Sequence, residues 1–153
     1  MTMNAGNPVD QDPSITHSHA WLAWFSAVLL AAVFLLAAVG VTGLQMTPKR
    51  PLAGVLATAV ATLWLILAVP GAMLLRSHIL KRQMAGLAIE GSRYVKGMAT
   101  VWGATAIGGG LAGLACMIGG GLMPGGVPWL IAIMTLIALS PAQARICADI
   151  TTS

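Results

Sequence analysis

The chain has 153 residues, of which 58% are hydrophobic and only 8% are charged, and its formal net charge is +4. A soluble domain carries about 25% charged residues. This composition excludes a soluble globular protein, because one core of this size cannot hide so many apolar side chains. The sequence therefore predicts an all-α integral membrane protein whose partner is the lipid bilayer, with no indication of nucleic-acid binding.

Residues 1–19 form a polar N-terminal tail, in which Asp12 and Pro13 favour a helix start with Asp at the N-cap and Pro at the first helical position. The apolar window at about residues 20–44 is longer than the 7–15-residue core of a signal peptide, and no Lys or Arg precedes it. We therefore expect the window to be retained as the first spanning helix.

Four side chains near the start of this helix are candidates for membrane anchoring or metal binding. Trp21 and Trp24 stand where an aromatic belt anchors a helix at the membrane interface. His17 and His19 form at most a weak metal site, since no carboxylate or thiol accompanies them, and terminal polar residues are usually solvated. The sequence predicts no metal and no cofactor.

The second apolar window covers about residues 51–75 and follows a short turn that contains Lys49 and Arg50. Pro51 suits a first helical turn, where the missing N–H is not needed. Pro70 and the glycine after it are expected to kink or end the regular helix near its far end.

A short basic amphipathic loop separates the second window from the third. Its glycines argue against one unbroken helix, so it is expected to be two helix extensions joined by a turn. Its cations are expected to contact anionic lipid or a partner, although they can equally be the charges that fix orientation; they are Arg76, Lys81, Arg82, Arg93 and Lys96.

Orientation follows from the cations near the helix ends. With four spanning helices the central loop and the C-terminal side together carry six cations, because Arg145 adds to the five of the loop. The opposite side carries only Lys49 and Arg50. The sequence thus predicts that both termini are cytoplasmic, and the compact, Ala- and Gly-rich helices favour a bacterial inner membrane.

The third window, at about residues 97–119, carries the strongest pattern in the chain. Small residues recur on one face of a helix, where residues four apart are neighbours, and such strips let membrane helices approach closely. We therefore predict a helix-packing face that consists of Thr100, Ala104, Gly108, Gly109, Ala112, Gly113, Cys116 and Gly120. Its partner can be another helix of the chain, where alanines repeat at the same spacing, a second copy, or a different subunit.

The fourth window, at about residues 127–144, is the weakest, because only about a dozen mostly apolar residues precede Ser140 and Pro141. The prediction is a four-helix membrane domain over residues 20–147, built from two hairpins, with a C-terminal tail at 148–153. A re-entrant fourth segment is the alternative.

No Asp, Glu, Lys or Arg occurs between Gly97 and Ala144. A Gly-rich helix in a short apolar chain is similar to the proteolipid rings of rotary ATPases, but those carry a carboxylate in mid-membrane. The same absence argues against proton-coupled transporters, since ionisable residues usually mark such pathways.

Three functions are weighed against one another. The favoured one is a non-catalytic accessory subunit that packs through its small-residue face against other membrane subunits or its own copies in a larger complex. The alternative is an oligomeric pore or small transporter with an uncharged path along threonine hydroxyls, and the four threonines are Thr58, Thr62, Thr100 and Thr105. An enzyme is not predicted, because the sequence contains no recognisable catalytic motif. The candidate catalytic residues would be an interfacial group, in which Glu90 and Arg93 can simply form an ion pair on a helix; the group is His78, Glu90, Arg93 and Tyr94.

Overall fold

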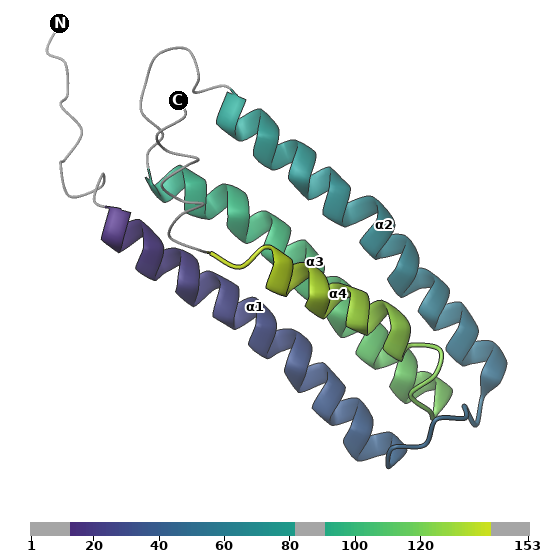
Figure 1. Ribbon diagram of the computed structural model, residues 1–153. Coiled ribbons are helices and arrows are strands. Elements are labelled where there is room, and N and C mark those ends of the chain that lie inside the picture. The colour runs from purple at the N-terminus through teal and green to yellow at the C-terminus, as the bar shows by residue number, and fades with distance from the viewer. Residues whose placement is uncertain (1–12, 82–90, 142–153) are drawn as a thin grey trace, which may run out of the picture.

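The computed structural model describes residues 13–81 and 91–141, and every regular element in them is a helix. Four helices follow one another in antiparallel order (Figure 1). They are α1 (Pro13–Thr42), α2 (Pro51–Lys81), α3 (Gly91–Gly119) and α4 (Gly126–Ala138).

Three of these helices are long and apolar enough to cross a membrane: the matching segments are His17–Thr42, Pro51–Ser77 and Val95–Gly119. A bilayer core of about 30 Å requires about 20 helical residues, and each segment exceeds that length. The expected all-helical membrane architecture is thus confirmed for the first three windows.

Helix α3 lies at the centre of the bundle. Within its apolar segment 61% of the residues are buried, against 17% in α1 and 17% in α2. Helices α1 and α2 lie on opposite sides of α3, with α4 in front of it (Figure 1), and the described parts of α1 and α2 do not contact each other. The molecule is therefore organised around the helix with the smallest side chains.

The helix starts agree with the proline signals of the sequence. Helix α1 begins at Pro13, inside the expected polar tail, and α2 begins at Pro51. Proline is favoured at such positions because its fixed φ suits a first turn that needs no N–H donor. At the other end of α1, Gly43 takes a φ of 60° and ends the helix.

Helices α2 and α3 both extend beyond the predicted apolar windows. Helix α2 continues unbroken through Pro70 to Lys81, because membrane helices tolerate proline where neighbouring groups compensate for the lost hydrogen bond. Helix α3 already begins at Gly91, so the basic segment contributes to two helix extensions, as expected. Residues 82–90, between the extensions, lie outside the described residues.

The fourth segment is shorter than predicted. Helix α4 has 13 residues, which at 1.5 Å per residue extend only about 20 Å. It ends at Ala138, where Ser140 and Pro141 follow, whereas the prediction extended it to residue 144. This helix is shorter than the about 20 residues that a bilayer core requires.

Candidate helix-packing site

The predicted packing face of α3 is mostly covered by the other helices of its own chain. Gly108, Gly109, Ala112, Gly113 and Cys116 are buried. Ala104 and Gly120, near the two ends of the strip, are half-buried, and Thr100 is exposed.

Close backbone approach explains why these positions carry no larger side chain. A Cβ atom added at Gly113 would lie 3.0 Å from the main-chain oxygen of Phe34 in α1. One added at Gly109 would lie 3.2 Å from the Cβ of Ala31, and one at Gly108 would collide with Leu65 of α2. The strip therefore receives α1 on one side and α2 on the other.

Helix α4 covers the strip between those two contacts. A Cβ added at Gly125 would lie 2.8 Å from the Sγ of Cys116 and 2.9 Å from the main-chain oxygen of Ala112. Ala132, two helical turns further on in α4, faces Gly109. Cys116 is not disulfide-bonded, and Cys147 lies outside the described residues.

The two loops at the far end of the bundle are fastened to each other by main-chain hydrogen bonds. The amide of Arg50 donates to the oxygen of Gly119 at 2.9 Å, and that of Leu122 donates to the oxygen of Gln45 at 2.7 Å. A Cβ at Gly121 would lie 2.6 Å from the oxygen of Thr47. The turn that precedes α2 and the turn that precedes α4 thus form one interlocked end.

Four tryptophans form a set of interhelical hydrogen bonds that the sequence patterns did not reveal. Trp64 of α2 donates to the oxygen of Ala104 at 2.9 Å. The other three join α4 to its neighbours, with the pairs Trp24 to Leu136 at 2.7 Å, Trp102 to Leu139 at 3.0 Å and Trp129 to Ala31 at 3.0 Å.

Two of these bonds satisfy main-chain groups at the end of α4. The last carbonyls of a helix have no partner in their own helix, and hydrocarbon offers none. The oxygens of Leu136 and Leu139 are such groups, and they accept from Trp24 and Trp102. Trp102 lies seven residues after Val95, the start of the apolar segment of α3, which is about 10 Å along the helix.

Within residues 13–81 and 91–141, no helix covers one face of α3. Its exposed large side chains are Ile107, Leu114 and Ile118, with exposed fractions of 47%, 39% and 49%. Towards the start of the helix the same face carries Thr100, which is exposed, and Gly103, where an added Cβ would meet nothing within 4 Å. On a helical wheel this face is opposite the one that α4 covers. We call these five residues the open face of α3.

The structure separates the predicted cationic contact residues. Lys96 is exposed, and Arg76 is half-buried with its Cγ 3.6 Å from the position of a Cβ added at Gly97. Lys81 and Arg93 lie in the ends of α2 and α3, but their side chains, and Arg82 altogether, lie outside the described residues.

Several other predicted groups turn out to be occupied locally. The hydroxyls of Thr58, Thr62, Thr100 and Thr105 each donate to a carbonyl three or four residues earlier in their own helix. The Nε2 of His17 accepts a hydrogen bond from Trp21 at 2.9 Å. Among residues 13–81 and 91–141 no three His, Cys, Asp or Glu side chains gather into a metal site. The side chains of His78, Glu90, Arg93 and Tyr94 lie outside the described part.

Fold and geometry define the class: a helical membrane protein with three long apolar helices and a fourth, shorter one. Comparison with protein-family models, curated protein sequences and solved structures finds no match to this chain.

Proposed function

We propose that the protein is a non-catalytic membrane subunit that packs against a helix of another subunit, or of a second copy, through the open face of α3. The observation that carries this proposal is the contrast between the two faces of one helix. The small-residue face is mostly covered by α1, α2 and α4, while the small residues Thr100 and Gly103 of the open face have no neighbouring helix in the described part of the chain.

The part of the open face near the start of α3 suits a helix partner. At Thr100 and Gly103 the backbone of α3 is covered by little side-chain bulk, and Ala104 beside them is only half-buried. Small residues of this kind let two membrane helices approach until their backbones are in van der Waals contact. About one helical turn after Gly103, Ile107 supplies an apolar side chain against which a partner can pack.

The pore alternative has weaker support. The hydroxyls of the four threonines proposed to line its path donate hydrogen bonds to carbonyls of their own helices.

The cytoplasmic placement of both termini also belongs to the proposal. It rests on the cation count, and α1 and α3 begin at the end of the bundle where Arg76 and Lys96 lie.

Photo-crosslinking in native membranes tests the proposal. A benzophenone side chain that replaces Ile107 should give a covalent adduct with another polypeptide. The matched control replaces Leu36, which is 69% exposed on α1, and should give adducts with lipid only. If both positions give only lipid adducts, the open face has no protein partner and the proposal fails.

A further inference from the structure

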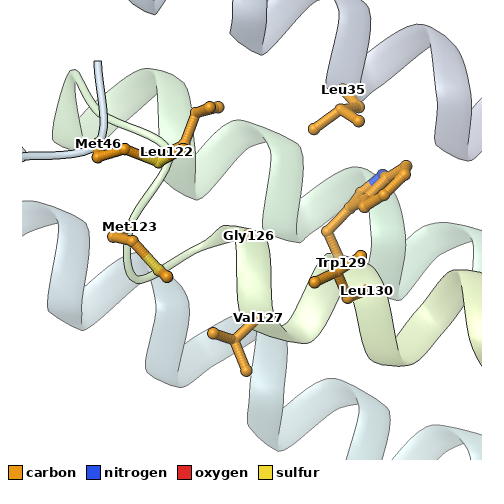
Figure 2. Close-up of a pocket in the computed structure, with 8 residues that line it drawn as sticks. All are labelled: Leu35, Met46, Leu122, Met123, Gly126, Val127, Trp129 and Leu130. Atoms are coloured by element: carbon orange, nitrogen blue, oxygen red, sulfur yellow. The ribbon is translucent and has the colours of Figure 1, made fainter. Parts of the chain in front are cut away.

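An apolar pocket of about 240 Å³ opens on the surface at the interlocked end of the bundle (Figure 2). Leu35 of α1 and Trp129 of α4 line one end of it, and Met46 and Leu122 of the two loops line the other. Val127, in the first turn of α4, also lines it. The pocket thus lies among α1, the start of α4 and the two loops.

The lining offers no free polar group to an occupant. The indole N–H of Trp129 donates to the oxygen of Ala31, and the first amides of α4 are also occupied, because Gly126 donates to Leu122 at 2.7 Å and Val127 to Pro124 at 3.2 Å. The exposed lining is almost wholly apolar and gives water few hydrogen-bond partners. The lining therefore selects a hydrocarbon chain.

Two cations lie at the same end of the molecule. Lys49 and Arg50 follow Met46 in one loop, and the amide of Met123 donates to the oxygen of Met46 at 3.2 Å, which holds this loop beside the start of α4. Both side chains are exposed. The four carboxylates of the chain are Asp10, Asp12, Glu90 and Asp149, and none of them lies among residues 13–81 and 91–141, so the described residues provide no acidic side chain to neutralise the pair.

We propose that the pocket binds one acyl chain of an anionic phospholipid, whose headgroup lies against Lys49 and Arg50. The chain fills a surface hollow that would otherwise lose dispersion contacts. The phosphate meets the cations at the level of the loops, where anionic headgroups attract Lys and Arg. This site is separate from the open face of α3, and its test does not depend on the proposed partner.

Native mass spectrometry of the purified full-length chain in mild detergent measures the headgroup preference. Titration with dioleoyl phosphatidylglycerol should give binding about tenfold tighter than with dioleoyl phosphatidylcholine. The Lys49→Gln, Arg50→Gln double variant should bind both lipids equally, while Lys96→Gln, which removes an exposed cation from the opposite end, should keep the preference. Equal binding of the two lipids by the unaltered chain would overturn the proposal.

A pocket-filling variant tests the acyl-chain site. Gly126 lines the pocket, and a Cβ added there meets nothing within 4 Å, so Gly126→Leu should fill the space without a clash. We expect it to weaken the binding of both lipids by about tenfold or more. Gly40→Leu is the matched control, because Gly40 is an exposed helical glycine with equally open surroundings. Unchanged lipid binding by Gly126→Leu, or a photo-crosslinker at Val127 that captures a polypeptide instead of lipid, would contradict the assignment.

Discussion

At the scale of single residues, the indole of Trp102 shows how this chain stabilises a helix end in hydrocarbon. Its side chain is fully buried, and its N–H satisfies the oxygen of Leu139 just beyond the end of α4. Hydrophobicity patterns treat such a tryptophan as one more apolar residue. An aromatic-belt interpretation likewise explains Trp21, which is exposed, but misses that half-buried Trp24 bonds to α4. These bonds depend on where α4 ends, which no local pattern around the tryptophans contains.

Trp102→Phe should lower the free energy of unfolding by about 1–2 kcal/mol, since it keeps an aromatic ring but leaves a carbonyl without a partner. Denaturant titration of the purified chain in detergent measures the change. Trp21→Phe is the control, because that indole bonds only within its own helix, and we expect it to change stability by less than about 0.5 kcal/mol. Equal losses in the two variants would show that the Trp102 bond does not stabilise the fold.

At the scale of helices, α3 illustrates which parts of the fold could be read from the sequence. The small-residue spacing predicted a helix-packing face, and hydropathy located three long helices. Hydropathy did not give the helix ends, because it records where the chain leaves hydrocarbon and not where hydrogen bonding stops, as the extension of α2 to Lys81 shows. The sequence also left undetermined which helix contacts the small-residue face. By spacing alone, the alanines of α1 and α2 and a helix of another subunit fit it equally well.

Two glycines of α3 allow a matched test of this packing. Gly113→Ala should lower the free energy of unfolding by about 1–3 kcal/mol, because the added methyl group meets the rigid backbone of Phe34. Gly103→Ala, on the open face of the same helix, should leave stability unchanged or raise it by up to about 1 kcal/mol through helix propensity. Thermal unfolding in detergent compares the two. A greater loss at Gly103 than at Gly113 would reverse the assignment of the faces.

At the scale of the whole molecule, the bundle is asymmetric around its central helix. One face of α3 is closed by α4, whose end accepts two tryptophan hydrogen bonds, and no described helix covers the opposite face. The sequence could not predict this division, because a helical wheel orders the residues of α3 without saying on which side α4 returns. The length of α4 and the contacts of Gly125 with α3 determine which face of α3 is covered.

The most direct test of this account is a map of which α3 residues contact lipid. The purified full-length chain in vesicles is labelled with a lipid-soluble diazirine, and mass spectrometry locates the adducts. At a high lipid-to-protein ratio, where no partner subunit or second copy covers the open face, the account predicts strong labelling of Ile107, Leu114 and Ile118 and little or none of Ala106 and Ala112, which are 1% and 0% exposed. Labelling of the two alanines at the level of the three large residues would contradict the central claim that the small-residue face of α3 is filled by its own chain.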